Sequence, residues 1–128
     1  MNRKIDFIID GEPQGKARPR FVKSTGHTYT PQKTKDYEKA VAWAYKAAGG
    51  EMFSGAVRIV IVAYFKIPKR GVQGLLRPLK KPDVDNITKI ILDGLNGVAY
   101  KDDKQVVSLL ISKFYGDPRV EVSVEELV

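Results

Sequence analysis

Four aspartates fall in two close pairs in the second half of the chain. Asp83 and Asp85 are two residues apart directly after Pro82, and Asp102 and Asp103 are adjacent in a later loop. Carboxylate oxygens are the ligands that Mg²⁺ and Mn²⁺ prefer, and these ions take few carboxylates and keep several waters. Gathering several acids is costly unless a cation neutralises them. The pattern therefore predicts a divalent metal site.

Each pair also has an ordinary structural explanation. An aspartate at the start of a helix caps the first amides and interacts favourably with the helix dipole, which accounts for Asp83. Acids are common in the first turn, and aspartate is a frequent turn former, which accounts for Asp102 and Asp103. From spacing alone, both the metal site and the structural explanation stay open.

A lysine accompanies the first pair of acids. Lys89 lies four residues after Asp85, so both belong to one side of a helix that begins near Asp83. It can hold a scissile phosphate or stabilise charge in the transition state. The alternative is a surface ion pair of a few tenths of a kcal/mol. Asp93, four residues further on, is expected to be structural, with Lys89 as a candidate partner.

The overall charge favours an anionic partner. The 128 residues carry a net charge of +7, with a pI near 9.6, and their number fits one domain over residues 1–128. Nucleic acid is the commonest partner for such a domain. Two stretches hold no acid, one between Glu12 and Asp36 and one between Ala56 and Pro82.

These two stretches supply the candidate phosphate contacts, which would read the backbone and not the bases. The alternative is that they are solvated basic loops. Pro19 biases the preceding residue towards an extended backbone, so Arg18 and Arg20 are expected to project to the same side. The residues assigned to DNA binding are Lys16, Arg18, Arg20, Lys69, Arg70, Arg77, Lys80 and Lys81.

Several chemistries are excluded. Without cysteine there are no disulfides, thiolate zinc sites or cysteine nucleophiles, and the single His27 excludes a site with two histidines from one chain. His27 itself is expected in an exposed loop. The chain has no Gly-x-x-x-x-Gly-Lys phosphate loop and no Gly-x-Ser-x-Gly elbow. No apolar run approaches the roughly 18 residues of a membrane span, so a cytoplasmic protein is expected.

Hydrophobic periodicity predicts an α/β (α+β) fold in which two main helices pack on one mixed sheet. The order is strand, helix, strand, helix, strand, strand, and ligands of such sheets gather near loops that join strands to helices. The expected elements are strand 5–10, a helix from Thr30-Pro31 to residue 48, strand 57–67, a helix from residue 83 to 95, and strands 106–115 and 119–125.

Finer expectations concern pairing and packing. Gly116-Asp117-Pro118 separates the last two strands and predicts that they form a hairpin. Trp43 is expected to widen the apolar stripe of the first helix and to pack in the core. The second helix is expected to bury an i, i+3, i+4, i+8 stripe, which consists of Ile87, Ile90, Ile91 and Leu95.

Three ordered motifs together resemble the signature of RusA-type endodeoxyribonucleases, which are Holliday junction resolvases often carried by prophages. They are Pro82-Asp83-Val84-Asp85-Asn86-Ile87-x-Lys89, then 92–97 (Leu-Asp-Gly-Leu-Asn-Gly), then 100–106 (Tyr-Lys-Asp-Asp-Lys-Gln-Val). The resemblance implies metal-binding acids at Asp83, Asp85 and Asp103 and an essential lysine at Lys89. Asp102 matches an acid that commonly precedes the catalytic one.

The resemblance also implies the activity. It is Mg²⁺-dependent hydrolysis of phosphodiesters, with Mn²⁺ as a possible substitute, in DNA recombination and repair. Two symmetric cuts in a four-way junction imply a homodimer, because one active site makes one nick. The alternatives are a flap or replication-fork nuclease and a non-catalytic module that binds branched DNA. The metal site expected from the sequence requires Asp83 and Asp103 of one chain to converge on a shared ion.

Overall fold

A four-stranded mixed sheet forms the body of the molecule. The computed structural model describes residues 3–72, 74 and 76–128. The strands are β1 (Lys4–Asp10), β4 (Val57–Phe65), β5 (Val106–Tyr115) and β6 (Arg119–Glu126), in the spatial order β1-β6-β4-β5. β6 runs antiparallel to both β1 and β4, whereas β4 and β5 are parallel. β4 and β6 are therefore interior strands, and β1 and β5 form the two edges.

The predicted hairpin between the last two strands is wrong. β5 and β6 do not pair with each other, because β4 lies between them. The turn at Gly116 passes over the end of β4. There the backbone amide of Gly116 donates a hydrogen bond of 2.9 Å to the carbonyl oxygen of Phe65. The Gly-Asp-Pro sequence marks a turn but does not determine which strands pair. The apolar β4, buried on alternate residues, takes the interior position instead.

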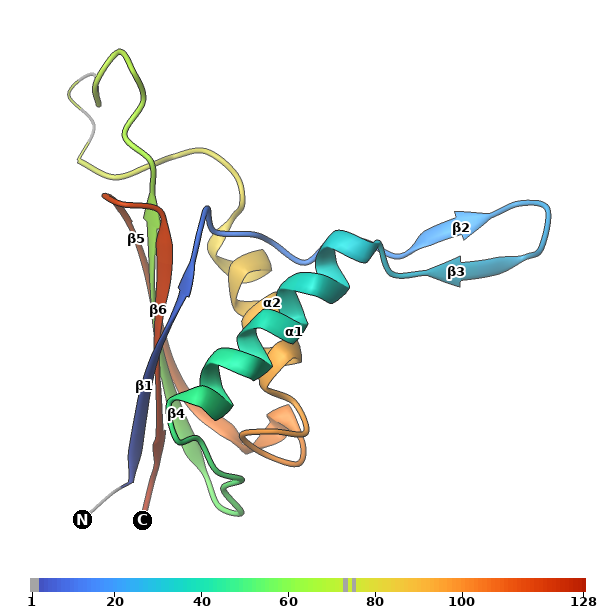
Figure 1. The fold of residues 1–128 in the computed structure, drawn as a ribbon, viewed down its shortest axis with the longest axis vertical. Coiled ribbons are helices and arrows are strands. Elements are labelled where there is room, and N and C mark those ends of the chain that lie inside the picture. Colours follow the sequence, from blue (N-terminus) through green and yellow to red (C-terminus); the bar gives the residue numbers. More distant parts are fainter. Residues whose placement is uncertain (1–2, 73, 75) are drawn as a thin grey trace.

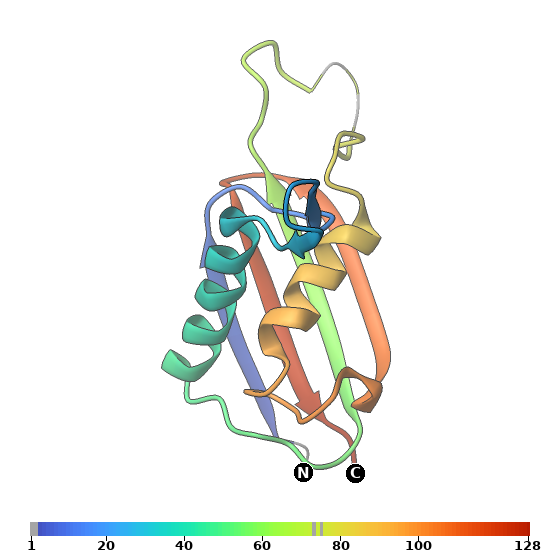
Figure 2. The same ribbon diagram turned by 90° about the vertical axis from the view of Figure 1, so that its right-hand side faces the viewer.

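Both helices lie on the same face of the sheet, and the opposite face carries no helix (Figures 1 and 2). α1 (Gln32–Ala47) precedes β4, and α2 (Val84–Leu95) connects the parallel strands β4 and β5. The predicted stripe of α2 is confirmed, since its four aliphatic residues are fully buried against the sheet and α1. This core fixes the direction of α2 and hence the position of its first turn.

The first helix departs from its predicted packing at one residue. Tyr37, Val41 and Tyr45 are buried as expected, but Trp43 is 73% exposed. Trp43 lies two residues from both Val41 and Tyr45, which places it roughly opposite them around a helix with 3.6 residues per turn. The indole therefore belongs to the outer surface of α1 and not to the core.

A backbone approach at Gly94 sets the spacing of the two helices. A Cβ atom at this position would lie 2.8 Å from Cβ of Val41 and 3.0 Å from the carbonyl oxygen of Glu38. Only glycine leaves the space for α1 to pack so closely against α2. None of the helices in the described part of the chain has the length and apolar character needed to span a bilayer.

A two-stranded ribbon projects from the body near the start of α1 (Figure 1). It consists of β2 (Arg20–Val22) and β3 (His27–Tyr29), which pair antiparallel. The sequence alone predicted a basic loop for this stretch. Phe21 and Val22 on one side of Ser24-Thr25-Gly26, with Thr28 and Tyr29 on the other, are the pattern that could have indicated a short hairpin.

Candidate active site and nucleic-acid interface

The first turn of α2 presents two carboxylates to solvent. Asp83 occupies the N-cap position, but its side chain makes no capping hydrogen bond, and Asp85 follows in the first turn. Both side chains are exposed, and neither makes a hydrogen bond or an ion pair with any described residue. Capping therefore does not account for the Asp83 side chain. The positive end of the helix dipole favours the negative charge of both groups.

Lys89 lies one helical turn beyond Asp85, on the exposed side of α2. Side chains four residues apart on a helix have their Cβ atoms about 5–6 Å apart. The ammonium group makes no ion pair within the described residues, so the surface ion pair considered for Lys89 is absent there. A free cation beside two free carboxylates is an arrangement that can hold a phosphate next to a bound metal ion.

The end of β5 holds the segment that leads into α2. The ammonium group of Lys113 donates hydrogen bonds to the carbonyl oxygens of Lys80, at 2.6 Å, and Pro82, at 3.0 Å. It also lies 4.9 Å from the ring centre of Phe65. Burial lowers the pKa of Lys113, and the nearby Asp83 carboxylate opposes this effect. Lys113 thereby fixes the backbone directly before the two acids, a role that the sequence analysis missed.

The basic segment before the ribbon packs against the other side of the same turn. The amide of Lys16 donates a hydrogen bond of 3.0 Å to the carbonyl oxygen of Asn86. A Cβ atom at Gly15 would lie 2.9 Å from Cβ of Pro82 and 3.0 Å from Cβ of Asn86. Gly15 and Lys16, which form the root of the ribbon, thus pack directly against the turn that carries Asp83.

The side chain of Lys16 has a different environment from the predicted phosphate contact. Its ammonium group pairs with Glu38 of α1 at 2.6 Å and with Asp93 of α2 at 3.0 Å. Burial lowers the pKa of Lys16, but the two carboxylates outweigh it and raise the pKa overall. Lys16 therefore cross-links both helices. The proposed pairing of Asp93 with Lys89 is wrong, because Asp93 pairs with Lys16.

The second pair of acids begins a short 3₁₀ helix, η1 (Asp103–Gln105). The Asp102 carboxylate accepts a hydrogen bond of 2.9 Å from the amide of Lys104, which lowers its pKa, and Gln105 completes a capping box. The side-chain amide of Gln105 also donates, through Nε2, to the carbonyl oxygens of Phe53 and Gly55. The structural explanation accounts for Asp102. Asp103 makes no capping hydrogen bond and remains exposed.

η1, which begins at Asp103, lies at the end of α2 opposite to the first turn that carries Asp85 (Figure 2). The helix has 12 residues, which corresponds to a length of about 18 Å. Asp103 lies at the beginning of β5, whereas Asp83 lies near Lys113 towards its end, about 23 Å along the strand. Burial raises the pKa of Tyr100, as do Asp103, Asp93 and Asp102, which places these acids at the far end of α2.

The prediction that Asp83 and Asp103 of one chain share an ion is therefore wrong. A metal held by both would require their oxygen atoms to lie within about 5 Å of one another, given ligand distances near 2.1 Å. No group of three or more acidic or histidine side chains among the described residues is placed to hold a metal ion. The sequence identified the acid pairs but could not show that the length of α2 separates them.

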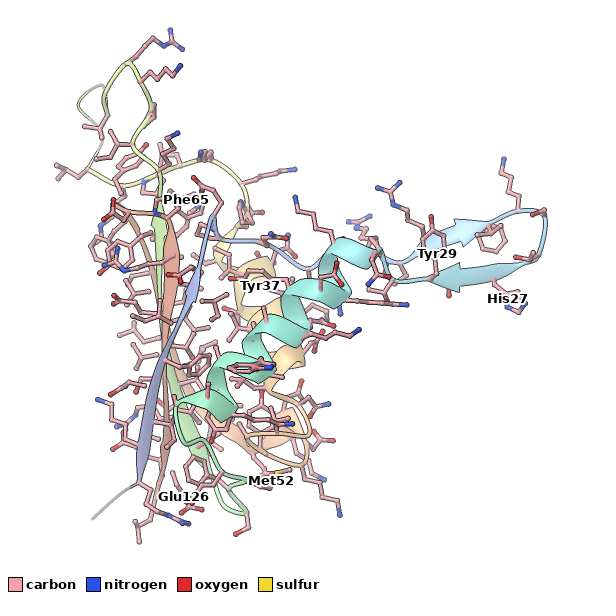
Figure 3. All side chains as sticks on the ribbon, in the orientation of Figure 1. His27, Tyr29, Tyr37, Met52, Phe65 and Glu126 are labelled. Atoms are coloured by element: carbon pink, nitrogen blue, oxygen red, sulfur yellow. The ribbon has the colours of Figure 1, made fainter. Side chains whose placement is uncertain are left out.

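The other predicted DNA contacts surround the first turn of α2 on two sides. Arg18 and Arg20 follow the ribbon root, and the loop between β4 and α2 carries the remaining basic residues. Arg77 stacks 3.9 Å from the ring centre of Phe114, which holds part of this loop to the sheet. The loop rises from the end of β4 near Phe65 (Figure 3). The predicted contacts in the loop are all exposed; they are Lys69, Arg70, Arg77, Lys80 and Lys81.

The site combines an exposed acid pair with an adjacent lysine, and basic segments flank it. This combination is typical of proteins that act on the phosphates of a polyanion. The family model of endodeoxyribonuclease RusA matches residues 10–125. The chain is also 39% identical over 137 aligned positions to the uncharacterized protein YqaN of Bacillus subtilis (strain 168), with 96% of each chain covered. The chain belongs to the RusA endodeoxyribonuclease family, and the predicted family and mixed α+β fold are confirmed.

Proposed function

We propose that the protein is a metal-dependent endonuclease that resolves four-way DNA junctions by paired, symmetric nicks. The observation that carries this proposal is the first turn of α2, where Asp83 and Asp85 have free carboxylates and Lys89 has a free ammonium group. Membership of an endodeoxyribonuclease family supports the reaction class. DNA recombination and repair are the processes in which such a reaction is needed.

The acids at the start of α2 suit Mg²⁺ or Mn²⁺ in part. These ions commonly take one or two carboxylates and fill their remaining positions with water and substrate phosphate. Asp83 and Asp85 supply two such groups in an open position. When bound, the metal would polarise the phosphoryl oxygen and make a water more nucleophilic. Lys89 would hold the same phosphate and offset the charge that develops on it.

A second copy of the chain would bring Asp103 to this site. Among the described residues no strand other than β4 pairs with β5, so β5 forms an edge of the sheet, and Val107, Leu109 and Leu110 are 45–62% exposed. An apolar edge is a surface on which another strand can pair, and β5 carries its one charged residue, Lys113, towards its end. Two-fold symmetry would make the two β5 strands antiparallel.

Antiparallel pairing centred near Leu109 and Leu110 would align the beginning of one β5 with the end of the other. Asp103 lies at the beginning, and Lys113 with Asp83 lies at the end. The partner subunit's Asp103 would therefore approach Asp83 and Asp85 of the first chain. Each dimer would contain two such sites, as two symmetric nicks require.

The basic segments would bind the phosphates of the junction arms, largely without reading sequence. The β2–β3 ribbon, whose basic segment includes Arg18 and Arg20, and the loop with Lys69, Arg70 and Lys81 leave the body in different directions (Figure 1), so they would contact different arms. Removal of acidic charge at Asp85 would weaken repulsion of the DNA, so binding does not depend on the carboxylate that cleavage needs.

Labelled four-way, flap and linear duplex DNA, each incubated with Mg²⁺ or with a chelator, test the proposal. We expect paired nicks in the four-way junction in the presence of metal. Asp85→Asn should lower nicking about a hundredfold or more and retain junction binding. Asp6→Asn, which removes an exposed carboxylate on β1, is the matched control and should cleave normally.

The possible results separate the alternatives. Preferential cutting of flaps would support a flap or fork nuclease on the same scaffold. Tight junction binding without metal-dependent cleavage of any substrate would contradict the enzyme and favour a DNA-binding module. Full activity of Asp85→Asn would remove that carboxylate from the site.

A further inference from the structure

The β2–β3 ribbon stands apart from the hydrophobic core. Its turn closes where the carbonyl oxygen of Val22 accepts hydrogen bonds from the amides of Thr25, at 3.3 Å, and Gly26, at 2.9 Å. Figures 1 and 3 show the ribbon extending away from both helices and from the sheet, with Tyr29 and His27 along it. An isolated two-stranded ribbon is only marginally stable in water. The ribbon therefore gains little stability from its position outside the core.

Two aromatic side chains are exposed on the ribbon. Phe21 is 61% exposed and Tyr29 is 48% exposed. Phe21 pairs with Thr28, and Arg20 pairs with Tyr29, so the two rings lie on opposite faces of the ribbon. Neither ring stacks on another ring of the described residues. Apolar surface left in water does not stabilise the fold, so the exposed ring of Phe21 is available to a ligand.

The charge around Phe21 indicates the chemical class of that ligand. Arg18, Arg20 and Lys23 are exposed and make no ion pair with any described residue, and residues 13–35 include no acid. A uniformly basic strip around an aromatic ring matches a nucleic acid, in which phosphates alternate with flat apolar bases. A typical protein surface carries charges of both signs and therefore complements this basic strip less well than a nucleic acid does.

The position of the ribbon relates it to the acids of α2. Its root is held by the hydrogen bond between the Lys16 amide and the Asn86 carbonyl, in the same turn as Asp83 and Asp85. From Ala17 to Lys23 an extended chain covers about 20 Å. This distance equals about six nucleotide steps of 3.4 Å. A DNA whose phosphate lies at the acids is therefore within reach of Phe21.

We propose that the ribbon recognises the branch point of DNA, with Phe21 stacked on a base face that the interrupted helix leaves open. A continuous duplex has no open base face, whereas the base pairs next to a branch can each expose one. An aromatic ring stacks on any base, and an inserted apolar side chain also separates base steps. Arg18 and Arg20 hold the flanking phosphates. The inference rests on the proposed function only in taking branched DNA as the substrate.

Binding in the presence of a chelator tests the inference without cleavage. The probes are a four-way junction and a linear duplex of the same sequence, with 2-aminopurine next to the branch to report unstacking. Phe21→Ala is expected to weaken junction binding about tenfold and to abolish the fluorescence increase. Duplex binding should change less than about twofold. Phe21→Trp should restore both junction signals, because it restores an aromatic ring.

Trp43→Ala is the matched control, since it removes another exposed aromatic ring, on α1, and should leave junction binding unchanged. Equal weakening of junction and duplex binding by Phe21→Ala, or no weakening, would overturn the inference. A loss of dimer mass in Phe21→Ala would also overturn it, because the ring would then serve a second copy of the chain. Absence of nuclease activity with an intact Phe21 effect would instead contradict only the proposed function.

Discussion

The amide of Lys16 donates a hydrogen bond to the carbonyl oxygen of Asn86 and thereby joins the root of the basic ribbon to the first turn of α2. The neighbouring Gly15 permits this contact, because a Cβ atom there would overlap Pro82 and Asn86. The same short segment thus positions the ribbon and the backbone around Asp83 and Asp85.

Gly15→Ala is expected to displace this turn. The added methyl group must push apart Gly15 and the Pro82–Asn86 backbone, which costs about 1–3 kcal/mol of stability. Nicking should fall more than tenfold, because the acids and Lys89 move relative to the ribbon. Urea unfolding and junction cleavage measure the two effects. Gly55→Ala is the control, since its Cβ would have no heavy atom closer than 3.8 Å; equal behaviour of both variants would contradict the account.

Gly94→Ala tests the close packing of the two helices. Its methyl group would lie 2.8 Å from Cβ of Val41, so α1 and α2 must separate. We expect a loss of about 1–3 kcal/mol in the free energy of unfolding. Chemical denaturation followed by circular dichroism measures this change. A variant as stable as the parent would show that the helices do not meet at this residue.

Lys113→Met should loosen the segment that precedes the acids. The substitution keeps most of the side-chain length but leaves the carbonyl oxygens of Lys80 and Pro82 without their donor. The expected effect is a reduction of kcat by about tenfold with little change in junction affinity, because the acids lose their fixed position. Lys113→Arg should recover part of the activity. Weakened binding with unchanged kcat would indicate that Lys113 contacts DNA instead.

Asp102→Asn tests the role of the second acid pair in stability. The hydrogen bond from the Lys104 amide lowers the pKa of Asp102 below its usual 3.8. A lowered pKa in the folded state stabilises the protein above pH 3.8, and this contribution is lost as the pH falls through the folded-state pKa. Asp102→Asn should therefore be less stable than the parent at neutral pH, and the difference should shrink below pH 3.8.

Urea midpoints measured across this pH range give that difference directly. Asp10→Asn removes an exposed carboxylate from β1 and controls for the general effect of net charge. A constant difference between Asp102→Asn and the parent, at neutral and at acidic pH, would show that the carboxylate charge does not stabilise η1.

The sequence predicted the parts of the fold that depend on local periodicity. The buried stripe of α2 and the glycine stop after α1 are both present: Gly49 adopts a φ of 85°, and the amide of Gly50 donates to the carbonyl oxygen of Tyr45. Strand pairing was not accessible, because Gly116-Asp117-Pro118 marks a turn without indicating that β4 lies between β5 and β6. The prediction that Trp43 packs in the core was wrong, because the sequence does not show which side of α1 faces the sheet and α2.

The sequence predicted which residues belong to the candidate site, but it did not predict how far apart they lie. The acids, Lys89 and the basic segments follow from residue type and spacing. The distance between Asp83 and Asp103 depends on the direction in which α2 crosses the sheet, which no local pattern contains. Lys16 was assigned to DNA because its positive charge is visible in the sequence, whereas Glu38 and Asp93 approach it only after both helices pack.

The most direct measurement is junction nicking by an equimolar mixture of Asp85→Asn and Asp103→Asn chains. In the proposed dimer, each variant alone has a defect in both sites. A mixed dimer has one site with both defects and one site in which Asp85 and the partner subunit's Asp103 are intact. The account predicts that mixing restores metal-dependent single nicks that neither variant makes alone. A mixture as inactive as its components, beside an active parent protein, would contradict it.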